Sequence, residues 1–132
     1  MKKEIDEFEI MKKYKFFKPE LGVQHTLMCF GFECGKGWNP LLVNLFDEIQ
    51  KLNPSDEFEI VQVKEKFGTL RVYTEGSSGE VIDNQIDKLI EEAELKASKT
   101  CEHCGSDGEM NGQGGWYRTI CTKCLEELKK GK

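Results

Sequence analysis

The sequence Cys101-Glu102-His103-Cys104 is followed, after sixteen intervening residues, by Cys121-Thr122-Lys123-Cys124. Thiolates at positions i and i+3 can both turn onto one ion, so two such pairs predict a tetrahedral site with four cysteine ligands. We therefore expect one Zn²⁺ per chain, bound by Cys101, Cys104, Cys121 and Cys124. Because four thiolates leave no coordination position open for water or substrate, this zinc is expected to be structural.

The residues around these cysteines predict a zinc ribbon over residues 100–132. Gly105 suits the tight turn of the first metal-binding knuckle, and residues 125–130 have the pattern of a short helix. Between the two pairs, residues 111–115 predict a mobile loop and residues 116–120 a returning strand. The loop and its aromatic neighbours Trp116 and Tyr117 either contact a ligand or shield the metal, and residues near Gly112 are also candidates for contact with a second subunit.

Length and composition favour one domain carrying a small metal-bound unit. The chain has 132 residues, 38% hydrophobic and 33% charged, which is enough for one buried core. No apolar run approaches the roughly 20 residues of a membrane span, and the N-terminus lacks the apolar segment of a signal peptide. We therefore expect a reducing cytoplasm, where four of the six cysteines bind metal and three disulfides do not form.

The charge balance disfavours binding to duplex DNA. The formal net charge is −5, and four ionised thiols with one bound Zn²⁺ would lower it by two. Affinity for phosphates comes from counterions released at basic surfaces, which an acidic chain provides only locally. A local basic surface is still compatible with this composition.

Residues 1–18 contain Ile5, Phe8 and Met11 at a spacing of three, which predicts one face of a short helix ending before Lys18-Pro19. Aromatic stripes of this kind usually pack into a core. The segment is therefore interpreted as a packing arm, with a partner-binding arm as the alternative.

Residues 31–38 contain three glycines and Trp38. Glycine permits positive φ and close backbone approach, so this loop either shapes a ligand site with Trp38 as a flat surface or forms a tight turn with Trp38 buried as an anchor. Cys29 and Cys34 are a poor match to a metal-binding knuckle and are interpreted as buried or reactive thiols, with a second metal site as the alternative. His25 has no evident catalytic partner and is interpreted as an ordinary hydrogen-bonded histidine.

The remaining pattern predicts an α+β core over residues 1–99, in which a small antiparallel hairpin packs with two helices. Asn39-Pro40 is expected to start a helix, with Asn39 as N-cap, that ends at Asn53-Pro54. Residues 58–64 and 69–74 predict the two hairpin strands, with Gly68 in the turn. Residues 80–98 predict a long amphipathic helix capped by Ser78 or Gly79. Because that helix leads directly into Cys101, we expect the ribbon to be docked on the core.

The hairpin carries the best candidate ligand-binding residues. Lys64, Lys66 and Arg71 are cationic, and Phe67 and Tyr73 lie between or beside them. Guanidinium and ammonium groups suit phosphate, while aromatic rings suit a planar base, so the pattern favours an anionic, planar ligand. The alternative is an ordinary solvated strand face.

Two segments together resemble a family of small phage and prophage proteins of unassigned function. They are the Gly-x-Gly-Trp loop at residues 35–38 and the Lys-Glu-Lys-Phe-Gly-x-Leu-Arg-x-Tyr hairpin at residues 64–73, followed by Cys-x-x-Cys-Gly at residues 101–105. The resemblance covers roughly residues 25 to 124. Members of that family commonly have Asp at the position of Lys36, which we include among the candidate ligand-binding residues with Trp38. The resemblance implies a phage or prophage context in the cytoplasm of a host bacterium.

Three hypotheses of function follow. Small accessory phage proteins often act against host defences, so the leading hypothesis is a non-enzymatic protein that binds and sequesters a nucleotide-type defence signal. The second is an inhibitor that blocks a host defence enzyme through its Trp and Phe surfaces. The third is a small hydrolase acting on a nucleotide signal through Glu33 or Glu65, for which the sequence shows no supporting constellation of His and carboxylates.

Overall fold

The computed structural model describes residues 7–112 and 117–130 of the chain. The described residues form an α+β fold with four α-helices and two small antiparallel sheets, as the sequence predicts. In chain order the elements are α1 (Glu7–Met11), α2 (Asn39–Lys51), β1 (Glu59–Lys66), β2 (Thr69–Glu75), α3 (Glu80–Ala97), β3 (Glu109–Asn111), β4 (Arg118–Ile120) and α4 (Thr122–Lys130). None of the helices in this part of the chain is both long enough and apolar enough to cross a lipid bilayer.

The hairpin β1–β2 is the framework of the core. Its two-residue turn consists of Phe67 and Gly68, whose φ angles of 53° and 81° are both positive, as in the type I′ turns that match the twist of a hairpin. The strands therefore continue to Lys66 and Thr69, which pair directly, so the turn is two residues shorter than the sequence predicts. The register shifts once, between Ile60 and Gln62.

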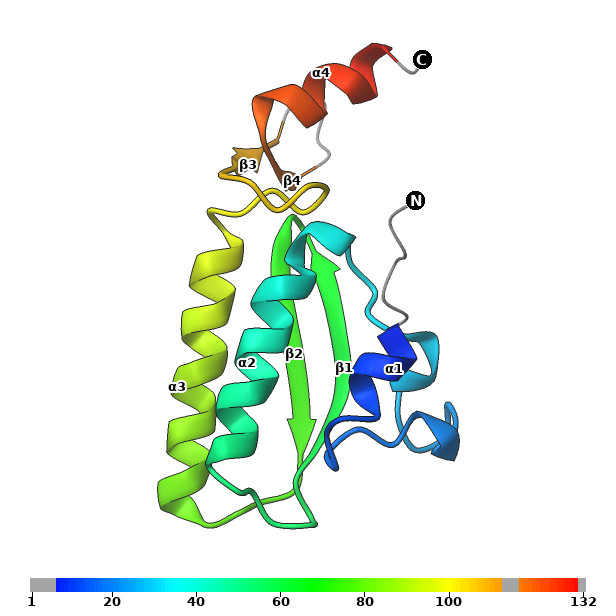
Figure 1. Cartoon of the computed structure of the whole chain (residues 1–132), viewed down its shortest axis with the longest axis vertical. Helices are drawn as coiled ribbons and strands as arrows, with labels where there is room; N and C mark the ends of the chain where they lie inside the picture. Colours follow the sequence, from blue (N-terminus) through cyan, green and yellow to red (C-terminus); the bar gives the residue numbers. More distant parts are fainter. Residues whose placement is uncertain (1–6, 113–116, 131–132) are drawn as a thin grey trace.

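Helices α2 and α3 lie side by side on one face of the hairpin (Figure 1). Because side chains alternate along a strand, Val63, Leu70 and Val72 point to this face and are buried. The apolar stripe of α3 faces them and is buried at Ile86, Ile90, Ala93 and Ala97. The opposite face of the hairpin carries the cross-strand pairs Gln62–Tyr73 and Lys64–Arg71.

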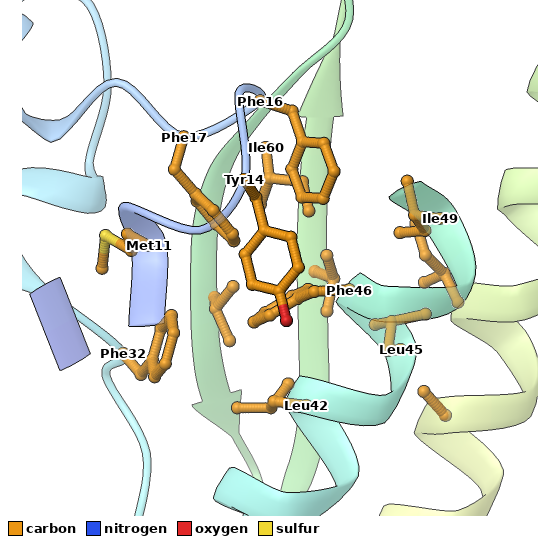
Figure 2. Packing of buried hydrophobic residues seen from close by; sticks show 14 of the residues in the cluster. Met11, Tyr14, Phe16, Phe17, Phe32, Leu42, Leu45, Phe46, Ile49 and Ile60 are labelled. Atoms are coloured by element: carbon orange, nitrogen blue, oxygen red, sulfur yellow. The ribbon is translucent and has the colours of Figure 1, made fainter. Parts of the chain in front are cut away.

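The N-terminal arm completes the core with aromatic rings. Tyr14, Phe16 and Phe17 are buried and surround Phe46 of α2, with the rings of Phe17 and Phe46 only 4.8 Å apart in an edge-to-face arrangement (Figure 2). The hydroxyl of Tyr14 donates to Asp47 at 2.6 Å, and burial together with this bond raises the pKa of Tyr14. Of the two interpretations of residues 1–18, these contacts show the packing arm.

The arm is less helical than the sequence predicts. Helix α1 ends at Met11, because the following chain must bury the adjacent rings of Phe16 and Phe17. The carbonyl of Phe16 also accepts the amide of Ile60 at 2.9 Å, which a continuing helix would not permit. Phe8 lies partly exposed, and Ile5 is outside the described residues.

The start of α2 also differs from the prediction. Residues Lys36–Trp38 form a 3₁₀ turn that leads directly into the helix. Asn39 is therefore already helical, with φ −57° and ψ −46°, and no side chain caps the helix. Asn39 is not the N-cap, whereas Pro40 lies in the first turn as expected.

Candidate metal centre and ligand-binding surface

The four cysteines predicted to bind metal converge at the C-terminal unit. Their sulfur atoms all lie within 4.8 Å of one another, and the sulfurs of Cys104 and Cys121 are 3.7 Å apart. A tetrahedron with metal–sulfur bonds of about 2.3 Å has sulfur–sulfur edges of about 3.8 Å. These residues therefore fit a metal ion held by four thiolates.

The local hydrogen bonds favour ionised thiols at two of these positions. The backbone N–H of Cys124 donates to the sulfur of Cys121 at 3.4 Å and lowers the pKa of Cys121 to about 6. The hydroxyl of Ser106, 2.9 Å from the sulfur of Cys104, lowers the pKa of Cys104. Because cysteines bind metal as thiolates, the apoprotein is electrostatically prepared for a cation. The pKa of Cys124 is raised, because its thiol is the one that hydrogen-bonds to Cys121.

The Gly-x-Gly-Trp loop at residues 35–38 binds the first metal-binding knuckle through hydrogen bonds. The indole N–H of Trp38 donates to the carbonyl of Thr100 at 2.8 Å, and the amide of Gly37 donates to the carbonyl of Glu102 at 2.7 Å. The amide of Gly35 donates to the carboxylate of Glu102, also at 2.7 Å. These bonds attach the ribbon directly to the start of α2.

Trp38 is 0% exposed, so its predicted role as a ligand-binding surface is wrong. Trp38 is the buried anchor of the alternative interpretation. Gly37 has an equally structural role, because a Cβ atom there would lie only 2.4 Å from the carbonyl oxygen of Cys101. The loop is glycine-rich because the knuckle backbone approaches it so closely.

The tip of the hairpin makes a second contact with the ribbon. The hydroxyl of Thr119 in β4 donates to the carbonyl of Gly68 at 2.7 Å, and Thr119 is fully buried. A Cβ atom at Gly68 would lie 2.7 Å from the sulfur of Met110 in β3. The carboxylate of Glu65 accepts the amide of Gly68 at 2.6 Å, which fixes the turn from within the hairpin.

Lys64, Arg71 and Tyr73 share the outer face of the hairpin, away from the helices. Lys64 pairs directly with Arg71 in the strand register, and Tyr73 is exposed one position further along that face. Within the described part of the chain, neither Lys64, Lys66 nor Arg71 has a carboxylate within 4.0 Å. The Nε–H of Arg71 donates to the hydroxyl of Thr69 at 3.1 Å, which orients the guanidinium on the outer face.

Phe67 and Lys66 lie at the tip of the same face. Phe67 is 67% exposed, and the ammonium of Lys66 lies 5.8 Å from the centre of its ring. Lys36 is exposed as well, but it belongs to the 3₁₀ turn beside the knuckle. Its neighbour Gly37 lines a cleft of about 680 Å³ between α2, α3 and the knuckle, and none of the hairpin cations lines that cleft. The glycine-rich loop at residues 35–38 and the cations Lys64, Lys66 and Arg71 therefore do not line this cleft together.

The two carboxylates considered for hydrolysis already bind donors within the protein. Glu65 holds the turn amide of Gly68, and Glu33 accepts the side-chain amide of Gln62 at 3.1 Å. Neither carboxylate is paired with a histidine among the described residues. The His–carboxylate contact that is present is a hydrogen bond of 2.8 Å between His25 and the buried Glu59. His25 is thus a hydrogen-bonded histidine, as expected.

The sequence did not indicate the roles of Glu102 and Thr119. Both connect the ribbon to the core, and both lie in stretches whose pattern shows only the ribbon itself. Burial raises the pKa of Glu102, and burial likewise raises the pKa of the nearby Cys34 thiol to about 12. A polar residue between two metal ligands gives no signal in the sequence that it also binds a distant loop.

Comparison with protein-family models, with curated proteins and with solved structures finds no match to this chain. The resemblance to phage and prophage proteins stays a prediction from the sequence. The functional argument therefore depends on the metal centre and on the outer face of the hairpin.

Proposed function

We propose that this chain is a non-enzymatic binding protein that holds a nucleotide-type anion on the outer face of its hairpin. The observation that carries the proposal is the direct cross-strand pairing of Lys64 with Arg71, neither of which forms an ion pair within the described residues. Like charges directly opposite each other destabilise a hairpin. An anionic ligand between the side chains of Lys64 and Arg71 would turn their electrostatic repulsion into a net attraction to the ligand.

The neighbouring groups support a ligand that contains both phosphate and a planar base. A guanidinium can bind phosphate through two parallel hydrogen bonds, and the bond from Arg71 to Thr69 uses only its Nε–H. Tyr73 lies beside the two cations on the same face and is exposed, which suits stacking against a base.

The biological context of the proposal comes from the family resemblance. We propose a phage or prophage accessory protein that acts in the cytoplasm of the host bacterium and counters antiviral defence by sequestering a nucleotide-type signal. Sequestration needs binding without turnover, and both Glu33 and Glu65 already accept hydrogen bonds from the protein. A hydrolase remains the alternative that measured turnover of a bound nucleotide would favour.

We propose that the metal is Zn²⁺ and that its role is structural. Four thiolate ligands are typical of structural zinc sites, and the site has no position for a substrate. The donor set also fits this role because the metal-binding knuckle is joined by hydrogen bonds to the core.

Calorimetric titration of the zinc-bound protein with cyclic dinucleotides and ADP-ribose derivatives tests the proposed function. Arg71→Ala should weaken binding by about tenfold or more, because a charge-assisted hydrogen bond contributes about 1.5 to 3 kcal/mol. Lys88→Ala, which removes an exposed cation of α3, is the matched control and should bind as the wild type does. Absence of binding by the intact protein would contradict the proposal.

A second candidate function is inhibition of a host defence enzyme by direct contact. Leu21 and Phe30 are exposed apolar residues on two neighbouring 3₁₀ turns, which is a surface suited to a protein partner. The buried Trp38 has no part in such a surface. Two results together would favour this function. The nucleotide titrations should show no heat of binding, and the wild-type chain should capture one host enzyme that the Phe30→Asn variant does not capture. Light scattering of the pure protein would show whether the partner is a second copy of the chain.

A further inference from the structure

Phe67 occupies a position in the hairpin turn that bulky residues rarely occupy. Its φ of 53° lies in the left-handed region, where type I′ turns favour Asn, Asp or Gly. Phe67 is 67% exposed, so burial within the chain does not compensate for this strain. Strained residues of this kind concentrate at functional sites.

The turn that presents Phe67 is held from both sides. The carboxylate of Glu65 accepts the amide of Gly68 at 2.6 Å, and the hydroxyl of Thr69 donates to the carbonyl of Lys66 at 2.6 Å. From the ribbon, the hydroxyl of Thr119 donates to the carbonyl of Gly68 at 2.7 Å. The backbone that carries the exposed ring is therefore held in place, which lowers the backbone entropy lost when a ligand stacks on the ring.

The exposed surface continues from Phe67 onto the ribbon. Met110 lies against Gly68, next to Phe67, and both Met110 and Tyr117 are exposed. In the other direction, the outer face of the hairpin leads from Lys66 through the Lys64–Arg71 pair to Tyr73. Rings thus lie at both ends of a row of three cations.

We propose that this row binds a single-stranded oligonucleotide, with bases on Phe67 and Tyr73 and phosphates on Lys64, Lys66 and Arg71. The inference rests on the proposed function and specifies its ligand class. From Thr69 to Tyr73 the strand extends about 14 Å at the usual rise per residue, and Phe67 and Tyr117 lengthen the surface further. A mononucleotide would contact only part of this length, whereas alternating rings and cations suit several successive nucleotides.

Fluorescence anisotropy with the zinc-bound full chain and 5′-labelled thymidine oligonucleotides tests the inference. Affinity should rise from two to eight nucleotides, and thymidine monophosphate should compete only weakly. With three cations on phosphates, the logarithm of the binding constant should fall against the logarithm of salt concentration with a slope of about −2. Equal affinity for the mononucleotide, or absence of oligonucleotide binding, would overturn the inference.

Phe67→Asn separates function from folding, because Asn tolerates the left-handed conformation of this turn. The variant should melt at the same temperature as the wild type or higher, yet bind the eight-nucleotide strand at least about fivefold more weakly, since one base loses its stacking ring. Phe30→Asn removes a ring that is exposed to a similar extent, 60%, and should leave binding unchanged. Unchanged binding by Phe67→Asn would overturn the inference.

The two proposals fail in distinguishable ways. Binding of a cyclic dinucleotide that depends on Arg71, without binding of any linear strand, would leave the proposed function standing and overturn the ligand class. Absence of both kinds of binding would contradict both proposals.

Discussion

Cys34 shows how the fold controls the chemistry of one residue. Burial, and after it the charges of nearby carboxylates led by Glu102, together raise the pKa of this thiol to about 12. At pH 8 only about one Cys34 in ten thousand would then be a thiolate, against about a quarter of ordinary thiols with a pKa near 8.5. The folded chain favours the neutral thiol of Cys34. The contribution of this thiol to the free energy of unfolding is therefore complete below about pH 8.5 and is lost as pH rises towards 12.

We therefore predict that Cys34 resists alkylation in the folded, zinc-bound protein. Iodoacetamide at pH 8 without reductant should leave Cys34 unmodified, and its rate should rise about tenfold per pH unit below the pKa. In denaturant, still without reductant, both Cys29 and Cys34 should react, because neither forms a disulfide in the structure. Peptide mass spectrometry reads both results, and rapid modification of native Cys34 at pH 8 would contradict the prediction.

Gly37→Ala tests the close approach between the loop and the metal-binding knuckle. The added Cβ would meet the carbonyl oxygens of Cys101 and Glu102 at 2.4 and 2.6 Å, so the knuckle must shift at a cost of about 1 to 3 kcal/mol. We expect lower stability in urea and zinc release to a chelator about tenfold faster. Gly79→Ala meets no atom within 4 Å, so it strains only its own backbone and should release zinc as the wild type does.

At the scale of elements, Thr119→Val tests the contact between the hairpin and the ribbon. Valine keeps the shape of threonine but leaves the buried carbonyl of Gly68 without the donor at 2.7 Å, which costs about 1 to 3 kcal/mol. The melting temperature should fall, and amide exchange at Gly68 and Thr69 should accelerate. Thr74→Val, a substitution on β2 that removes no hydrogen bond among the described residues, should change neither.

The sequence predicts the elements whose pattern is local. The hairpin follows from β-branched alternation with Gly68, and helix α3 follows from a continuous apolar stripe that ends at Ala97, one residue before the predicted end. Helix α4 begins at Thr122, three residues before its predicted start, because the second knuckle itself is helical. The predicted strand over residues 116–120 is present as β4 from Arg118, whereas residues 113–116 lie outside the described residues.

The sequence predicts poorly whatever depends on a distant partner. The local sequence around Gly37 and Trp38 is compatible both with a ligand-binding loop and with a loop that binds the metal-binding knuckle. Only the contact with the knuckle distinguishes the two roles, and that contact is distant in sequence: Trp38 and Thr100 are 62 positions apart. The metal ligands are the opposite case, because their spacing alone predicts the four-sulfur cluster that the structure contains. For the hairpin cations, alternation predicts their common face. Whether a carboxylate forms an ion pair with them is a tertiary property, and Glu94 of α3 lies near enough to Arg71 for the charge of Arg71 to act on its pKa.

At the scale of the whole molecule, the metal should maintain the connection between core and ribbon. Structural zinc contributes about 10 to 16 kcal/mol of apparent binding free energy in small modules, so Cys104→Ser should unfold at least the ribbon. We expect elemental analysis to find one zinc per wild-type chain, and loss of amide protection at Gly35 and Gly37 in the variant. Cys29→Ser removes a thiol outside the metal site and should retain zinc. A fully folded protein without metal would contradict this prediction.

The hydrogen bond from Trp38 to Thr100, 62 positions along the chain, has a consequence for synthesis on the ribosome. At about 5 to 20 residues per second, several seconds pass between translation of the tryptophan and translation of its acceptor. During that interval the indole N–H and the amides of Gly35 and Gly37 lack the acceptors that they have in the complete fold. The metal-binding knuckle can therefore bind to the loop at residues 35–38 only after residues 100–102 have been translated. The metal site is complete only when Cys121 and Cys124 follow.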